Sequence, residues 1–167
     1  AWEEFRELVD LINCPASTSM SARSAYDNDH SNYLLGMGEA ALTARREADV
    51  VLAVGTRLGN LDLPYDIYFG APAKQKLIQV DIDPRNVGTN RPIAMGIVAD
   101  AGATLRALLG RLKELGVKPA DGTAVKKYRD MEAEQMAVLE AAPRGYEGDR
   151  VHPATSVEAA AKVFGPQ

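Results

Sequence analysis

The sequence has few of the residues that build disulfide-bonded, nucleic-acid-binding or membrane-spanning proteins. Its one cysteine, Cys14, excludes an internal disulfide and makes the cytoplasm the expected compartment. The net charge is -4 and no basic run occurs, so we expect no nucleic-acid partner. No apolar run approaches the roughly 20 residues that cross a bilayer, and no secretory signal pattern is present, so we expect no membrane partner.

Histidine is almost as scarce, with only His30 and His152 in the chain. A zinc site normally uses three or four ligands at recognisable spacing. Asp27, Asp29 and His30 could form a metal or acid–base cluster, but we favour a loop with turn-forming residues. His152 precedes a helix-starting proline, and Cys14 has no cationic neighbour in the sequence. We therefore expect neither a catalytic residue nor a metal ligand in this chain.

Short apolar runs that stop at small or acidic residues predict the strands of a buried parallel sheet. They cover residues 49–54, 77–83 and 93–99, and the first and last are followed by Gly55 and Asp100. Runs of about 4–8 β-branched and apolar residues with such ends are typical of strands buried on both faces. Helical patterns precede and follow them, which favours parallel strands.

Apolar residues at helical spacing predict helices between and after these strands. The expected ranges are 2–12, 39–47, 126–141 and 154–163. A leucine-rich helix also follows Asp100, its expected N-cap, and a short strand is expected over 14–19. The predicted fold class is α/β: a doubly wound parallel sheet of about four to six strands in three αβα layers, with a helical extension from Thr123 onward.

The domain organisation is predicted from a loop that contains Pro119 and Gly122. We expect an α/β domain over 1–116, and a linker with the start of another domain over 117–167. A further polar linker is expected at 143–149. The chain opens without Met in a helical pattern, and the strand that such a helix would follow is absent. We therefore expect a piece of a longer polypeptide, truncated at both ends.

The carboxyl ends of the first two predicted strands carry the strongest candidate for a small-molecule site. Gly55, Thr56 and Arg57 follow the first strand, and Asp81 and Ile82 lie at the end of the second. In open α/β sheets ligands bind at these ends. The arginine either binds a phosphate or carboxylate in bidentate fashion or forms a surface salt bridge. The aspartate either accepts a hydrogen bond from a ribose or starts a turn, and both alternatives stay open.

A second candidate is the loop that leads into the helix at 39–47. Gly36, Met37 and Gly38 lie at this junction, where small residues let the backbone approach a ligand and free N–H groups favour anions. The pattern is not GxGxxG. A ligand contact and a tight turn therefore remain equally open interpretations of these residues.

Four segments, taken in order, resemble the central domain of thiamine-diphosphate-dependent enzymes. The resemblance is to the group that contains acetolactate synthase, pyruvate oxidase and sulfoacetaldehyde acetyltransferase, and it extends from about residue 1 to 115. The segments are Asp29-His30 with Tyr33-Leu34-Leu35-Gly36-Met37, Ala48 to Arg57, Leu77 to Pro84, and Ile97 to Asp100. The central domain of this family begins with a strand that is absent here, which agrees with a truncated N-terminus.

The resemblance implies the chemistry of a whole enzyme rather than of this chain. Thiamine diphosphate and Mg²⁺ are implied to bind to domains outside it, so the chain alone is expected to be inactive. The parent would be a lyase or transferase that decarboxylates or joins 2-oxo acids or related acyl donors through the thiamine ylid. Its partners would be the other domains of the polypeptide and further copies in a homodimer or homotetramer.

The resemblance also implies that FAD or ADP can bind in a central domain of this kind. The residues implied to lie near the flavin, the diphosphate or the adenosine are Gly36, Met37, Gly55, Thr56, Arg57, Asp81, Ile82 and Asp100. Two alternatives stay open. One is a nicotinamide-dinucleotide-binding dehydrogenase domain, against which the lack of GxGxxG counts. The other is a non-catalytic scaffold domain with no ligand.

Overall fold

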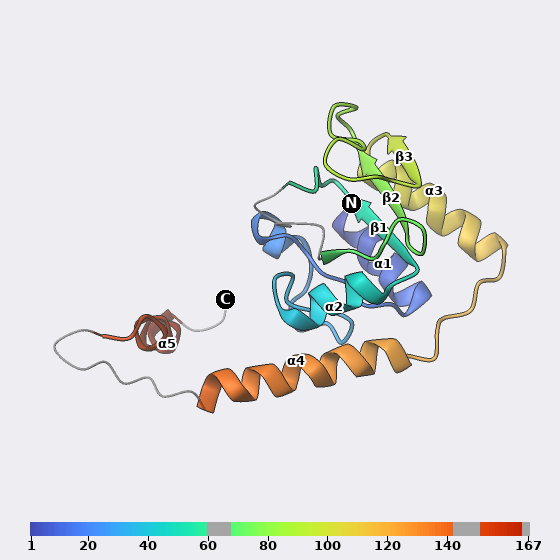
Figure 1. Ribbon diagram of the computed structural model, residues 1–167. Helices are drawn as coiled ribbons and strands as arrows, with labels where there is room; N and C mark the ends of the chain where they lie inside the picture. Colours follow the sequence, from blue (N-terminus) through green and yellow to red (C-terminus); the bar gives the residue numbers. More distant parts are fainter. Residues whose placement is uncertain (60–67, 142–150, 165–167) are drawn as a thin grey trace. The chain divides into compact units, whose positions relative to one another are not determined.

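The computed structural model describes residues 1–59, 68–141 and 151–164 (Figure 1). The elements in chain order are α1 (Trp2–Ile12), η1 (Met20–Ala25), α2 (Glu39–Glu47), β1 (Val50–Val54), β2 (Lys76–Asp81), β3 (Met95–Val98), α3 (Ala101–Glu114), α4 (Thr123–Ala141) and α5 (Pro153–Phe164). Every helix expected from the apolar spacing is present, and each of the three apolar runs contains a strand.

The strands form one parallel sheet in the order β1-β2-β3. Val50 of β1 pairs with Lys76 of β2, and Ile78 of β2 pairs with Met95 of β3. The α/β class with a parallel sheet is therefore confirmed. The described part of the chain contains three strands instead of the four to six expected.

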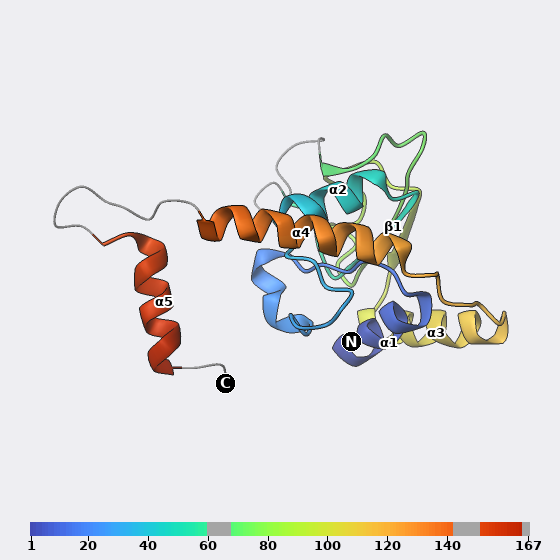
Figure 2. The same ribbon diagram turned by 90° about the horizontal axis from the view of Figure 1, so that it is seen from below.

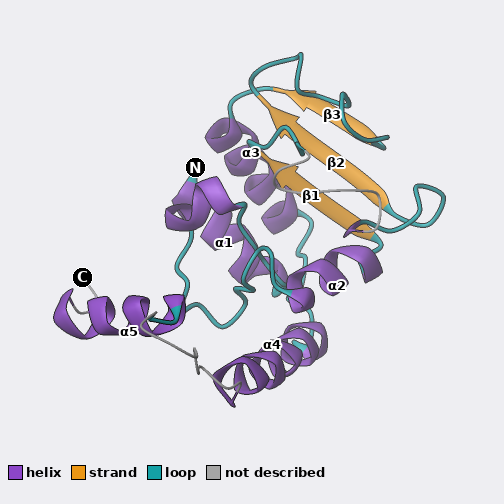
Figure 3. Cartoon of the chain, turned by 60° about the vertical axis from the view of Figure 1, so that its left-hand side comes forward, coloured by secondary structure: helices purple, strands orange, loops and turns teal. Residues whose placement is uncertain are grey.

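Helices α1 and α3 lie together on one face of the sheet (Figure 3). Alternate residues of a strand point to opposite faces, and Leu52 and Val54 of β1 point to this one. They pack against Leu105 and Leu109 of α3, and Leu8 of α1 completes the cluster. Figures 1 and 2 show the two helices side by side. This cluster fixes the sheet against the helix that follows β3.

The opposite face of the sheet carries a second cluster. Ala53 of β1 and Leu77 of β2 pack there with Leu58 and Phe69, which belong to the connection between these two strands. Gln79 lies two residues after Leu77 and therefore points to the same face, where it is buried. On this face of the sheet, the side chains of β2 are therefore apolar at its start, at Leu77, and polar nearer its carboxyl end, at Gln79.

The predicted strand over 14–19 is wrong. This segment makes only an isolated bridge, between Ala16 and Tyr33. The Ala16 N–H donates to the Asn32 carbonyl at 2.9 Å. The side-chain Nδ2 of Asn32 donates to the Cys14 carbonyl at 3.1 Å, so a side chain takes the place of the next rung of a ladder.

The first part of α4 packs against α2, and Figure 2 shows the two helices along one another. Tyr128 of α4 is buried among Leu34, Ala40 and Ala41. Its hydroxyl donates to Glu47 Oε2, at the end of α2, at 2.8 Å. Both apolar burial and a hydrogen bond therefore hold this part of the helical extension on the α/β unit.

The chain divides into two compact units, Ala1–Ala133 and Glu134–Gln167. The division predicted between residues 116 and 117 stays a prediction about domain organisation. In the second unit no described residue of α5 is buried, and the linker predicted at 143–149 lies outside the described residues. Among the described helices, none has the length and apolar character needed to cross a membrane.

Candidate functional site

The carboxyl ends of the three strands meet at one edge of the sheet. The N–H of Gly55, directly after β1, donates to the Val80 carbonyl at 2.8 Å. The N–H of Ala99, directly after β3, donates to the Asp81 carbonyl at 3.1 Å. Gly55, Asp81 and Asp100, which the sequence nominated separately, therefore lie at the same edge. We call the ends of the strands, together with residues 55–58, 82–90 and 99–100 that come directly after them, the carboxyl edge.

The turn after β1 presents an arginine to solvent. Gly55 has φ 63°, and a Cβ at this position would meet nothing within 4 Å. Leu58 also has positive φ, at 53°, and is buried, with its N–H donating to Thr56 Oγ1 at 3.2 Å. The Arg57 side chain between them is exposed and has no hydrogen-bond or ion-pair partner among the described residues. The surface salt-bridge alternative therefore finds no support in the described structure.

Gln79 joins the loops that follow β1 and β2. It is 1% exposed. Its Nε2 donates to the Thr56 carbonyl at 2.9 Å and to the Asn86 carbonyl at 3.0 Å. Its Oε1 accepts from the Gly88 N–H at 2.8 Å. Outside this network, Asn90 Nδ2 donates to the backbone carbonyl of Arg57 at 2.8 Å, which ties the same two loops at the surface.

Asp81 makes the contacts of a residue that starts a turn. It is buried, and its Oδ1 accepts from the Asp83 N–H at 2.9 Å and from Asn86 Nδ2 at 3.2 Å. Aspartate commonly caps the backbone two residues ahead in this way. The turn alternative is therefore realised, and a hydrogen bond to a ribose stays a prediction.

The exposed side chain of Ile82 is followed in the chain by an ion pair between Asp83 and Arg85. Asp83 and Arg85 form a bidentate pair, with Arg85 Nη2 2.6 Å from Asp83 Oδ2 and Arg85 Nε 2.9 Å from Oδ1. The guanidinium holds the pKa of the Asp83 carboxyl below its usual range. Ile82 itself is 72% exposed. The carboxyl edge thus offers an exposed apolar side chain and, at Arg57, a cation with no described partner, which together suit a flat ring joined to a phosphate.

Asp100 caps α3, as the sequence predicts. Its side chain accepts a hydrogen bond from the Ala103 N–H at 2.8 Å. A carboxylate at this position satisfies one of the free N–H groups of the first turn. Its contact with an adenosine stays a prediction.

Gly36 and Met37 belong to a separate loop, which precedes α2. A Cβ on Gly36 would lie 1.8 Å from the Thr18 carbonyl oxygen, so glycine is required where the chain approaches itself. Arg45 donates through Nη2 to the Gly36 carbonyl, and burial lowers the pKa of this guanidinium. These contacts support the tight-turn interpretation, and a flavin contact stays a prediction.

Comparison with known proteins agrees with this architecture. The family model of the thiamine pyrophosphate enzyme central domain matches residues 1–108. The chain belongs to this family. The match covers all three strands, the carboxyl edge and the loop before α2.

Curated relatives of this central domain include two named enzymes. Sulfoacetaldehyde acetyltransferase of Rhodobacter capsulatus is 38% identical over 111 residues, which are 63% of this chain and 19% of the relative. Acetolactate synthase of Mycobacterium bovis is 33% identical over 122 residues, which are 68% of this chain and 19% of the relative. The chain thus spans about one fifth of the length of these relatives.

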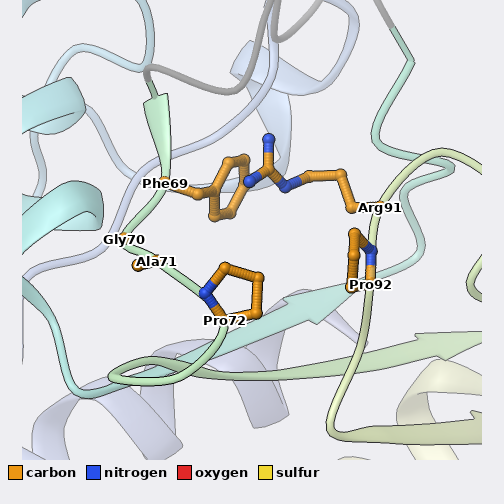
Figure 4. A pocket seen from close by; sticks show the side chains of 6 residues that line it. All are labelled: Phe69, Gly70, Ala71, Pro72, Arg91 and Pro92. Carbon is orange, nitrogen blue, oxygen red and sulfur yellow. The ribbon is translucent and has the colours of Figure 1, made fainter.

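A pocket lies between the later parts of the two loops that follow β1 and β2 (Figure 4). It has a volume of about 340 Å³ and is lined by Phe69, Gly70, Ala71, Pro72, Arg91 and Pro92. The Arg91 guanidinium lies over the Phe69 ring, 4.3 Å from its centroid. These residues precede β2 and β3, at the amino ends of the strands. No residue that the sequence nominated for a ligand lines this pocket.

The acidic loop around His30 has the contacts of a folded loop. The Asp29 N–H donates to Asp27 Oδ1 at 2.9 Å. His30 Nε2 lies 2.9 Å from Asp10 Oδ1, and the Asn32 N–H donates to His30 Nδ1 at 3.2 Å. No group of three or more His, Cys, Asp or Glu residues that could hold a metal ion occurs in residues 1–59, 68–141 and 151–164. These contacts favour the loop interpretation over a metal cluster.

Sequence reasoning missed Gln79, Asn86 and Asn90, which hold the carboxyl edge together. Only Gln79 carries a local signal, because a polar residue within the apolar run LIQV must find partners for both ends of its amide. The identity of those partners depends on two loops, because the bonded residues lie 23 positions earlier and 7 positions later in the chain.

Proposed function

We propose that the complete protein containing this chain is a thiamine-diphosphate-dependent enzyme that decarboxylates or joins 2-oxo acids or related acyl donors. The match of residues 1–108 to the family's central domain carries this proposal. The names of its acetyltransferase and synthase relatives support it. Thiamine diphosphate, with Mg²⁺, would supply the electron sink for the acyl group.

The chain itself acts in this proposal as a central scaffold and not as a catalytic domain. Its described residues gather no set of metal-ligating side chains and so do not fit a Mg²⁺-bound diphosphate. We assign that cofactor to other domains of the same polypeptide. The whole enzyme would assemble as a homodimer or homotetramer, and the cytoplasm stays the compartment predicted from the single cysteine of this chain.

We infer that the carboxyl edge binds FAD or ADP in the parent enzyme. The Arg57 guanidinium is exposed and has no partner among the described residues, on a turn that begins at Gly55, which supports a contact with the diphosphate. The exposed side chain of Ile82 supports an apolar contact with the adenine, and Asp81 and Asp100 would lie beside the ribose. Gly36 and Met37, in the loop before α2, would lie nearer the flavin.

Cofactor dependence tests the proposed enzyme class. The complete protein, freed of cofactors, should release CO₂ from a 2-oxo acid such as pyruvate only after both thiamine diphosphate and Mg²⁺ are returned. The 167-residue chain should show no activity under the same conditions. Turnover that needs NAD instead of thiamine diphosphate would contradict the proposal and favour the dehydrogenase alternative.

Calorimetric titration of the complete protein tests the nucleotide site separately. FAD or ADP should bind, and Arg57→Ala should weaken that binding by about tenfold to a hundredfold, since a charge-assisted bidentate contact contributes on the order of 1.5–3 kcal/mol. The control is Arg85→Ala, because Arg85 is already paired with Asp83. The scaffold alternative predicts no binding of FAD, ADP or NAD.

A further inference from the structure

Two buried glutamines make the same kind of contact at opposite ends of β2. Gln75 lies just before the strand and is 6% exposed, and Gln79 lies near its end and is 1% exposed. Gln75 Nε2 donates to the carbonyls of Arg45 and Ala48, each at 2.6 Å. Its Oε1 accepts from the Gly70 N–H at 3.1 Å. Each glutamine therefore satisfies three backbone groups through one side chain.

The two differ in what their partners do. The partners of Gln75 lie at the end of α2 and before β2, at the amino ends of the strands. The partners of Gln79 lie in both loops of the carboxyl edge: Thr56 in the first, and Asn86 and Gly88 in the second. The buried Gln79 side chain thus links the turn that presents Arg57 to the turn that follows Asp81, beneath the surface bond from Asn90 to the Arg57 carbonyl.

Holding the two loops in advance has a consequence for binding. When a loop adopts its binding-competent conformation only part of the time, the apparent affinity is the intrinsic affinity multiplied by that fraction. Gly55 and Gly88 both have positive φ, at 63° and 72°, and glycine restricts the backbone least. Without the amide of Gln79 between them, these turns would sample more conformations, and a ligand that spans both would have to order them.

We propose that Gln79 is a positioning residue for the nucleotide, one that sets the separation of the two loops and touches no ligand itself. The inference rests on the nucleotide site proposed above. Its partners are all backbone groups, so the effect of Gln79 passes through loop geometry and not through charge or ligand contact.

The test compares matched variants of the complete protein by calorimetric titration with ADP. Gln79→Met removes all three hydrogen bonds at nearly constant volume, and Gln75→Met does the same at the other end of the strand. Both should lower resistance to urea, since each removes the side-chain partner of three backbone groups. Only Gln79→Met should weaken ADP binding, by about tenfold, which corresponds to 1.4 kcal/mol. Gln75→Met should stay within about twofold of the wild type.

Gln79→Glu is the second variant, in case the methionine variant does not fold. As a carboxylate it can accept from Gly88 but cannot donate to Thr56 or Asn86, whereas the protonated acid can donate to one of them. The affinity of the Gln79→Glu variant for ADP should therefore approach that of the wild type as the pH falls. The affinity of Gln75→Glu relative to the wild type should not change with pH.

The outcomes separate the two proposals. A wild-type protein that binds neither ADP nor FAD overturns the nucleotide site and this inference with it. Binding that Gln79→Met and Gln79→Glu leave at wild-type strength overturns the inference alone. Equal losses of affinity in the Gln75 and Gln79 variants, or Gln79 variants that fold at no pH, show a residue that serves the core and overturn it as well.

Discussion

At the scale of single residues, substitution by alanine should change stability in opposite directions at a loop glycine, Gly36, and at a helix glycine, Gly110. A Cβ on Gly36 would lie 1.8 Å from the Thr18 carbonyl oxygen, whereas one on Gly110, inside α3, would meet nothing within 4 Å. Gly36→Ala should cost at least about 2 kcal/mol, because backbone must move. Gly110→Ala should stabilise the chain by about 1 kcal/mol, the helix-propensity difference.

Urea denaturation of the two glycine variants, followed by circular dichroism, measures both changes. Gly110→Ala also serves as the control, since it adds the same methyl group without a clash. A Gly36→Ala variant as stable as the wild type would contradict the close approach of the loop before α2 to Thr18.

Asp100 has a structural role that can be measured apart from any ligand. Its side chain accepts from the Ala103 N–H at 2.8 Å and caps α3. Asp100→Ala should lower the free energy of unfolding by about 1 kcal/mol, whereas Asp100→Ser, which can still cap the helix, should lose only a few tenths. Thermal or urea unfolding checks this. If both variants lose the same stability, the loss does not come from the cap.

At the scale of elements, the sequence predicted those parts whose signal is local. The apolar runs at 49–54 and 77–83 contain β1 and β2, because a short run of β-branched and apolar residues is itself the signal of a buried strand. The strand expected over 14–19 failed, because its only bridge and its nearest side-chain bond come from Tyr33 and Asn32, more than a dozen residues away. Propensity in a short run of small residues does not supply such a partner.

The candidate site shows the same limit. Gly55 and Asp81 could be placed at one edge, because parallel strands end on the same side of a sheet. That Arg57 has no partner in the described part of the chain, and that Gln79 bonds both loops, could not be foreseen, since each depends on which groups other loops bring within reach.

The docking of α4 should depend on pH through Glu47. Hydrogen bonds from Lys127, at 2.5 Å, and from Tyr128, at 2.8 Å, lower the pKa of this carboxyl from its usual 4.5. A carboxyl with a lowered pKa in the folded state stabilises it above pH 4.5, and this contribution is lost as the pH falls through the folded pKa. The stability difference between wild type and Glu47→Gln should therefore shrink on acidification.

Urea unfolding at neutral pH, and at a series of acidic pH values below 4.5, the usual pKa of this carboxyl, compares the two proteins. The matched control is Glu3→Gln, because Glu3 is exposed and has no hydrogen-bond partner among the described residues. That variant removes a carboxylate without breaking a described hydrogen bond, so its stability should stay close to that of the wild type. A Glu47→Gln protein whose deficit is the same at all of these pH values would show that the two hydrogen bonds do not stabilise the fold.

At the scale of the whole molecule, the first unit, Ala1–Ala133, holds every element that builds the carboxyl edge. The pocket lined by Phe69 and Arg91 lies at the amino ends of the same strands. These are two different places in one sheet. A ligand bound at the carboxyl edge and one bound in the pocket would therefore contact different residues. The central claim, that the carboxyl edge is the nucleotide site of this domain, can be tested residue by residue.

The most direct measurement is an NMR titration of the isotopically labelled complete protein with ADP, read at each backbone amide. The claim predicts shifts concentrated at Gly55–Arg57, at 81–83 and at 86–88, with little change at 69–71 and at Arg91. Shifts confined to 69–71 and Arg91 would place the nucleotide in the pocket instead. Those shifts, or no shifts at saturating ADP, would contradict the claim.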